Sequence, residues 1–88
     1  MSRSEKQWTL DPETLGDVLA RWERHDPSDE ERDSLYEFLM SLTTNPYTVG
    51  KEDGESGVWL GRPDVFTLVT YVIDPPNRMV FLADINHI

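Results

Sequence analysis

Apolar residues in the first half of the chain recur at the spacing of an amphipathic helix. In residues 11–25, Asp11 stands where it can cap a helix, and Pro12 follows at the first helical position, where a missing N–H costs nothing. The apolar positions that follow at i, i+3, i+4 and i+7 are Leu15, Val18, Leu19 and Trp22. We therefore expect a first helix with one apolar face, ended by the sequence His25-Asp26-Pro27.

A second helix is predicted directly after this break. Ser28 followed by Glu31 is the pattern of a capping box. The apolar residues again form one stripe, at Leu35, Phe38, Leu39 and Leu42. Pro46 places the end of the helix near residue 44, because the residue before a proline avoids the helical region. Since so short a link joins the two helices, we expect an antiparallel hairpin.

The second half of the chain changes to strand-like patterns. A charged, glycine-rich loop is expected over residues 49–57. Three runs rich in β-branched and aromatic residues follow, at 57–62, 64–73 and 78–88. The Asp-Pro-Pro-Asn sequence at 74–77 is a tight connection, so the last two runs are expected to pair antiparallel.

These elements predict an α+β fold. Residues 7–10 are expected to add a short edge strand before the first helix. The predicted order is β-α-α-β-β-β, with the helical hairpin packed on one face of a small, mostly antiparallel sheet. We expect residues 1–88 to form a single domain, because the length suits one small core.

Alternation along the last two runs assigns their faces. In residues 78–88 one side carries no charge and is expected to face the helices: Met79, Phe81, Ala83, Ile85 and His87. In residues 64–73 the side expected to join it holds Val65, Thr67, Val69, Tyr71 and Ile73. The remaining positions would form an open face with an apolar patch, and a β-bulge would invert part of this register.

The open face is the strongest candidate for binding, because exposed apolar patches usually mark partner or ligand contacts. The candidate residues are Arg62, Phe66, Leu68, Thr70, Val80, Leu82, Asp84 and Asn86. No metal site is expected, since His25 ends a helix and alternation turns His87 away from Asp84 and Asn86. No nucleophile–base pair is visible in the sequence, so the catalytic residues are unknown and no cofactor is expected.

Charge narrows the choice of partner. Eight Lys and Arg against seventeen Asp and Glu give a net charge of −9 and a pI near 4.4. Phosphate backbones are bound through Lys and Arg, so this composition argues against unaided nucleic-acid binding. The chain has no cysteine, which excludes disulfides and thiolate metal sites. No apolar run has the length of a membrane span or a leader, so we expect no membrane association and a cytoplasmic location.

Four fragments, taken in order, resemble the RelE/ParE toxin family of bacterial type II toxin–antitoxin systems. They are QWTLDPETLGDVLARW, LTTNPYTVG, GVWLGRPDVFTLVTYVID and RMVFLADINHI, which together cover nearly the whole chain. The resemblance implies the fold predicted above, with His87 in the place of the family's terminal histidine. It also implies an antitoxin-like or other protein partner, while a homodimer would be the simpler use of the same face.

The family's ribonuclease residues do not carry over. In its nucleolytic members, Arg and Lys side chains on the open face stabilise the charge that develops at the scissile phosphate. The arginine that the family writes three places before the strand-ending tyrosine is Leu68 here, and the one after the final histidine is Ile88. The family's lysines have no counterpart beyond Lys51.

Three functions fit the sequence to different degrees. The one that we favour is a toxin–antitoxin family protein that acts by protein binding, as ParE-like members do on gyrase, without ribonuclease activity. A ribosome-dependent mRNA endoribonuclease fits the fold but neither the residues nor the charge. A toxin fold recruited as a small-molecule enzyme or biosynthetic accessory protein fits the apolar face, but the sequence indicates no particular reaction for it.

Overall fold

The helices begin where the capping residues stand. In the computed structural model, which describes residues 7–54 and 56–88, α1 (Pro12–Glu23) follows Asp11, whose Oδ2 accepts from the backbone N–H of Thr14 at 2.9 Å. Helix α2 (Asp29–Thr44) begins with the complete capping box. The Ser28 hydroxyl accepts from the N–H of Glu31 at 3.1 Å, and the Glu31 carboxylate accepts from the N–H of Ser28 at 2.8 Å. Both helix predictions are confirmed.

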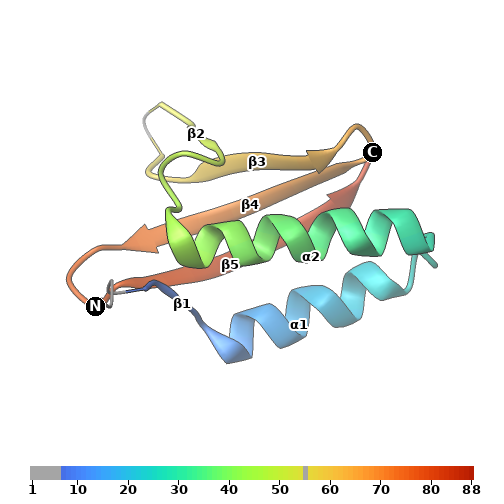
Figure 1. The fold of residues 1–88 in the computed structure, drawn as a ribbon, viewed down its shortest axis with the longest axis horizontal. Coiled ribbons are helices and arrows are strands. Elements are labelled where there is room, and N and C mark those ends of the chain that lie inside the picture. The colour runs from blue at the N-terminus through green and yellow to red at the C-terminus, as the bar shows by residue number, and fades with distance from the viewer. Residues whose placement is uncertain (1–6, 55) are drawn as a thin grey trace, which may run out of the picture.

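The sheet of the described chain has five strands in the order β1-β5-β4-β3-β2 (Figure 1). Their bounds are Thr9–Leu10 for β1, Lys51–Glu52 for β2, Trp59–Asp64 for β3, Thr67–Asp74 for β4 and Met79–His87 for β5. Strand β1 pairs parallel with β5, and the other neighbours pair antiparallel. The α+β class is thus confirmed, with a mixed sheet. The glycine-rich segment predicted as a loop contains β2, which forms a short hairpin with β3.

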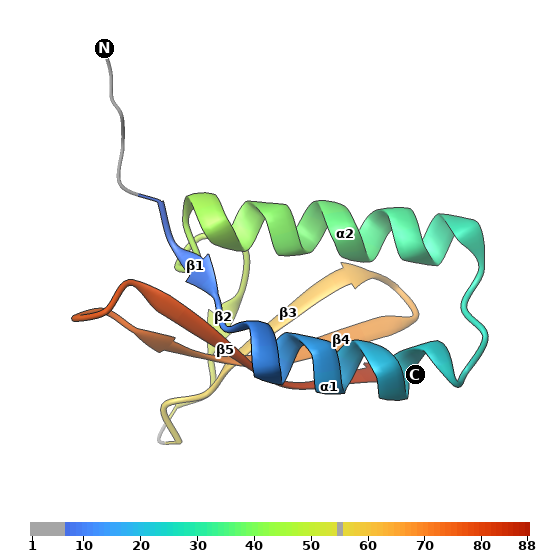
Figure 2. The same ribbon diagram turned by 90° about the horizontal axis from the view of Figure 1, so that it is seen from below.

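The two helices run antiparallel and contribute to one core with the sheet. Helix α2 crosses over the sheet, while α1 lies along β5 (Figures 1 and 2). We call the face of the sheet that packs on this core the inner face. The core contains the buried residues of both predicted stripes, Val18, Trp22, Leu35, Phe38, Leu39 and Leu42, together with Val69, Tyr71, Val80, Leu82, Ile85 and Trp8.

A β-bulge in β5 makes half of the predicted register wrong. Tyr71 pairs with Leu82 and Thr70 pairs with Asp84, so Ala83 is the extra residue between two regular ladders. Before the bulge, Val80 and Leu82 face the core, with 0% and 2% of their surfaces exposed. Both were predicted on the open face. Met79 and Phe81, predicted to lie inside, take the opposite face by alternation.

After the bulge, the predicted register holds. Ile85 is buried opposite Val69, and Asp84 and Asn86 share the outer side of the strand. In β4, the inward assignment of Thr67, Val69 and Tyr71 is also confirmed, since all three are fully buried. The predicted inward position of Val65 is wrong, because this residue lies in the turn before β4 and is 71% exposed. The bulge therefore decides which residues the sheet offers to solvent.

Tyr71 ties the inner face to the segment after α2. Its hydroxyl donates to the carbonyl of Pro46 at 2.8 Å, and burial raises the pKa of Tyr71 to about 12. Gly50 lies directly against this side chain, because a Cβ at position 50 would stand 2.3 Å from the tyrosine oxygen. Residues 46–50 are thereby held close to β3 and β4.

Candidate functional site

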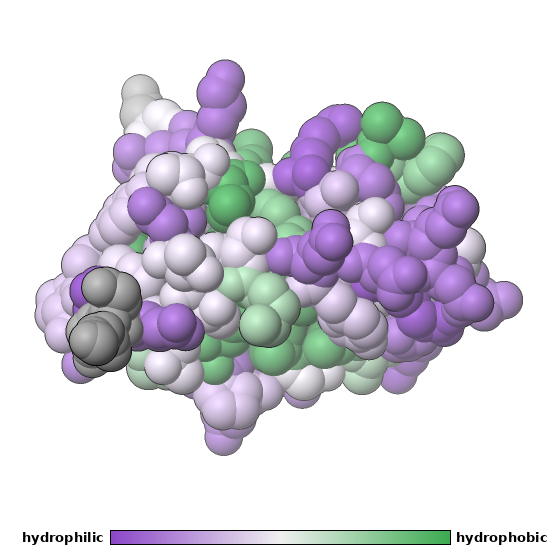
Figure 3. Space-filling view, viewed as in Figure 1, coloured by the Kyte–Doolittle hydropathy of each residue, from purple (hydrophilic) through white to green (hydrophobic). Residues whose placement is uncertain are grey.

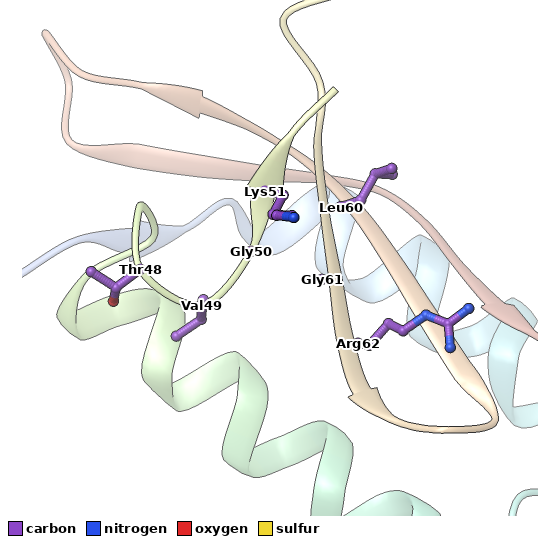
Figure 4. A pocket seen from close by; sticks show the side chains of 7 residues that line it. All are labelled: Thr48, Val49, Gly50, Lys51, Leu60, Gly61 and Arg62. Atoms are coloured by element: carbon purple, nitrogen blue, oxygen red, sulfur yellow. The ribbon is translucent and has the colours of Figure 1, made fainter. Parts of the chain in front are cut away.

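The sheet face opposite the helices is covered by no helix formed by residues 7–54 and 56–88 (Figure 2), and we call it the open face. Alternation from the paired registers assigns its residues. They are Lys51 from β2, Leu60 and Arg62 from β3, Leu68, Thr70, Val72 and Asp74 from β4, and Met79, Phe81, Asp84 and Asn86 from β5. Figure 4 shows Leu60 and Arg62 pointing to the same side of β3. The open face thus takes side chains from four strands.

Five of the eight predicted site residues meet on this face. Leu68 stands opposite Asn86 and Thr70 opposite Asp84 in neighbouring strands, and Arg62 lies at the outer side of the same surface. Val80 and Leu82 are absent from it because of the bulge. The prediction for Phe66 is also wrong, since its ring lies in the β3–β4 turn and stacks on His87, with 6.1 Å between the ring centroids.

Six open-face residues were not assigned to the site by the sequence analysis: Leu60, Val72, Met79 and Phe81 are apolar, and Lys51 and Asp74 are charged. Val72 stands opposite Phe81, and Leu60 stands opposite Thr70 on the other side of β4. Val72 is 38% exposed, while Leu60, Leu68 and Phe81 are half-buried. Val72 was predicted on the open face but not as a site residue. Phe81 could have been found only by locating the bulge, because the two alternating sets before Ala83 are both apolar.

Charge is unevenly distributed over the open face. The cations Lys51 and Arg62 stand on β2 and β3, whereas Asp74 and Asp84 stand on β4 and β5. Neither cation forms an ion pair within 4.0 Å with the described residues. The side chains that the described strands place here include no histidine, serine or cysteine, and the hydroxyl among them belongs to Thr70, which stands opposite Asp84. Its chemistry suits contact with another molecule.

A groove borders the outer edge of β3, next to the open face. It has a volume of about 370 Å³ and is lined by Thr48, Val49, Gly50, Lys51, Leu60, Gly61 and Arg62 (Figure 4). The lining comes from two segments, the chain that leaves α2 and the middle of β3. Gly61 permits the close approach of Phe38 beneath the groove, because a Cβ there would stand 2.2 Å from the Phe38 ring. The floor of the groove is therefore part of the core.

The structure brings together two histidines that the sequence analysis kept apart. His87 lies on the inner side of β5 but at its exposed end, and its ring stacks on His25 with 6.3 Å between the centroids. Its Nε2 lies 3.1 Å from Oε2 of Glu31. Hydrogen bonding from the Ser28 N–H, with a smaller contribution from His87, holds the pKa of Glu31 below its usual range. The cluster joins the end of β5 to the start of α2.

This histidine cluster does not form a metal site. Over residues 7–54 and 56–88, no three His, Asp or Glu side chains are arranged to hold a metal ion. Figure 3, which views the side where α2 lies in front, shows hydrophilic residues gathered over the end of the molecule where α1 passes to α2. The His25–His87 contact borders that acidic end, so its observed role is to connect two elements.

Comparisons with known proteins leave the site to be interpreted from its geometry. No protein-family model matches the chain, and a search of curated proteins finds no match. Neither helix of the described chain combines the length and apolarity needed to cross a membrane. The open face and the groove beside it are therefore the features of the structure that bear on function.

Proposed function

We propose that this protein is a RelE/ParE-like member of a toxin–antitoxin system that acts by binding another protein through the open face. The observation that carries the proposal is the apolar row Leu60, Leu68, Val72 and Phe81 on a sheet face that no helix of the described part of the chain covers. Apolar side chains that stay in contact with water across several strands favour association with a partner. The order of the elements, with both helices before the long strands, agrees with the resemblance to this family.

The same row argues against ribonuclease activity. The resemblance implies cations at positions 68 and 88, where this chain has leucine and isoleucine. On the open face, β4 and β5 supply no cation at all, and their charged residues there are Asp74 and Asp84. A phosphoryl transition state needs preorganised positive charge, and the loss of one such donor typically costs about 10²–10³ in rate.

The partner should be complementary in charge as well as in apolar surface. With a net charge of −9, the protein attracts basic molecules over long range and repels nucleic acid. A basic or amphipathic antitoxin segment fits both requirements, and so does a basic surface of a target protein. A second copy of the acidic chain fits the apolar row but not the charge.

Substitutions on the open face test the proposal. We expect Val72→Asp and Phe81→Asp to abolish capture of the native partner from the bacterial host while the far-ultraviolet spectrum stays unchanged. Tyr36→Asp is the matched control, because Tyr36 is similarly exposed but lies on α2. Capture that survives both open-face substitutions would contradict the proposal. Mass spectrometry of the captured protein distinguishes an antitoxin or gyrase from a ribosome or a biosynthetic enzyme.

A separate assay tests the absence of nuclease chemistry. Single-turnover incubation of the protein with mRNA on stalled ribosomes should give no more cleavage than the Leu68→Glu variant. Cleavage well above that control would show that the protein is an enzyme. Light scattering of the isolated protein measures its oligomeric state. If the protein is a dimer and Phe81→Asp makes it a monomer, the open face is the contact between copies.

A further inference from the structure

Three apolar side chains meet in solvent at one end of the sheet, and we call them the end patch. Val65 and Phe66 form the turn between β3 and β4, and Ile88 directly follows β5. Each of the three has more than half of its surface exposed. The N–H of Ile88 donates to the carbonyl of Phe66 at 2.7 Å, so the two segments lie side by side. The end patch shares no residue with the open face.

Hydrogen bonds and ring contacts hold the end patch in place. Oδ1 of Asp64 accepts from the N–H of Phe66 at 2.9 Å and fixes the turn. The Phe66 ring stacks on His87, and the His87 ring also stacks on His25. Nε2 of His87 lies 3.1 Å from Oε2 of Glu31 at the start of α2. Because the patch is ordered before a partner arrives, binding there costs little conformational entropy.

Grouping distinguishes the end patch from ordinary exposed apolar residues. Single apolar side chains are common on protein surfaces, whereas adjacent ones usually mark a contact with another molecule. Figure 3 shows hydrophobic residues gathered at its upper right, over the end of the molecule where Figure 1 places the β3–β4 turn. Hydrophilic residues border them in the same view. The end patch therefore resembles the apolar centre and polar rim of a protein interface.

The rim of the end patch is acidic. Residues 23–33 link α1 to α2 at this end of the molecule (Figures 1 and 2), and they hold six carboxylates and two arginines. One of these arginines, Arg32, is already engaged by Glu23 at 2.9 Å and by Asp29 at 3.5 Å. Asp64 adds a carboxylate in the turn itself. This excess of negative charge disfavours nucleic acid and a second copy of the chain, and it favours a cationic partner.

We infer that the end patch binds a segment of a partner protein in which an apolar or aromatic side chain is flanked by Lys or Arg. The apolar side chain packs on Val65 and Ile88, and the cationic group lies over the exposed part of the Phe66 ring, whose quadrupole attracts it. The acidic rim attracts the segment over a longer range. This surface is separate from the open face, so the inference adds a second contact to the proposed function and can fail without it.

Selection from a displayed library of random dodecapeptides, carried out on the intact protein at low salt, tests this inference. We expect the selected peptides to combine aromatic or large aliphatic residues with Lys or Arg. Their affinity should fall as the salt concentration rises, because salt screens the attraction to the acidic rim. A selection that yields no such peptides would overturn the inference.

Substitutions locate the binding site of the selected peptides. Phe66→Ala and Val65→Ser should each weaken binding about 10- to 30-fold, the effect of removing a central interface contact. The matched control is Met40→Ser, because Met40 is nearly as exposed as Val65 but lies on α2, and this variant should bind normally. Val65→Ser keeps the test decisive if Phe66→Ala disturbs the stacking on His87, since Val65 takes no part in that contact.

Charge reversal tests the acidic rim. Glu30→Lys, in the first turn of α2, should weaken binding about 2- to 5-fold at low salt, the range for an exposed ion pair. Glu52→Lys makes the same change in net charge on β2, which pairs with the end of β3 away from the turn, and should have a smaller effect. Equal effects of the two reversals would show that only the net charge acts, and would overturn the inference.

Amide hydrogen exchange distinguishes the end patch from the open face. A peptide bound at the end patch should slow the exchange of the Ile88 N–H, because it shields the hydrogen bond to Phe66 from water. Unchanged exchange at this position would overturn the inference. If Val72→Asp or Phe81→Asp abolishes peptide binding and the end-patch variants do not, the inference is overturned and the proposed function stands. If only the end-patch variants lose the peptides, the inference stands whatever the open face binds.

Discussion

Thr67 is a buried polar residue whose hydroxyl finds no partner in the described chain. Its side chain is fully buried on the inner face of β4, and its Oγ1 has no hydrogen-bond partner there. A buried hydroxyl without a partner loses its bonds to water and gains none in return. We expect Thr67→Val, which keeps the shape and the strand preference, to raise the free energy of unfolding by about 1 kcal/mol.

Chemical denaturation followed by tryptophan fluorescence measures this change. Thr70→Val in the same strand is the control, because Thr70 faces the open side and keeps access to water. Its effect should stay within about 0.5 kcal/mol, as is usual for surface substitutions. A lower unfolding midpoint for Thr67→Val would mean that the hydroxyl has a partner after all.

Tyr71, in contrast to Thr67, has a buried hydroxyl that forms a hydrogen bond. Tyr71→Phe removes the hydrogen bond to Pro46 and leaves the buried carbonyl without a donor, which should cost about 1–3 kcal/mol in the free energy of unfolding. Urea denaturation of both proteins at neutral pH measures the loss. Tyr36→Phe is the control, since the exposed Tyr36 has no such bond in the described structure, and an equal loss there would contradict the assignment.

The raised pKa of Tyr71 also predicts an effect of alkaline pH. The folded protein holds the phenolic proton up to a pKa of about 12, whereas the unfolded chain releases it near 10. Stability should therefore decline as the pH rises above 10, because only the unfolded state gains from deprotonation in that range. Tyr71→Phe should show a smaller decline over the same range, and an unchanged decline would exclude this residue as its source.

At the scale of elements, the helices were predictable because their signals are local. Asp11 and the Ser28–Glu31 pair satisfy backbone groups within three residues, and the apolar stripes repeat at fixed spacing. The faces of β5 were predictable only beyond the bulge. There, Asp84 and Asn86 alternate with Ile85, so polarity distinguishes the two sides.

Before the bulge, the alternation of residues along β5 does not distinguish the inner side from the outer side. Met79 and Phe81 on one side and Val80 and Leu82 on the other are all apolar, so either set could fill the core. Packing against both helices chooses Val80 and Leu82. The contact between His25 and His87 could not be predicted from the sequence either, because it depends on where the end of α1 lies relative to β5.

The connection between α2 and β5 predicts a specific acid sensitivity. Hydrogen bonding lowers the pKa of Glu31 in the folded protein below 4.5, so its contribution to stability is present above that pH and is lost as the pH falls through the folded value. Glu31→Gln should therefore be less stable than the parent protein at neutral pH, and the difference should shrink in acid.

Thermal unfolding as a function of pH provides the measurement. Glu30→Gln is the matched control, because Glu30 occupies the same helical turn but is exposed and makes no hydrogen bond within the described structure. A difference between Glu31→Gln and the parent that persists unchanged in acid would show that packing, and not the ionised carboxylate, is responsible.

At the scale of the whole molecule, the net charge of −9 lowers the stability of the folded state. Like charges that folding brings together repel one another, and salt screens this repulsion beyond about 10 Å at 0.1 M. We expect sodium chloride to raise the melting temperature between low and moderate ionic strength. Asp33→Asn, at an exposed position on α2, should reduce this increase. A melting temperature that falls with salt would mean that local ion pairs, such as Arg32–Glu23, outweigh the net repulsion.

The parallel pairing of β1 with β5 joins segments that are about 70 residues apart in the chain. The hairpins β2–β3 and β4–β5 can close over a few residues, but β1 has no strand to pair with until the start of β5 is in place. Contacts between residues so far apart in the chain cost loop-closure entropy, and they therefore form in slow steps of folding. During synthesis, residues 9–10 must therefore wait for almost the whole sheet to leave the ribosome, and so must the contact of Trp8 with Arg78, whose guanidinium lies 5.1 Å from the centre of the indole ring.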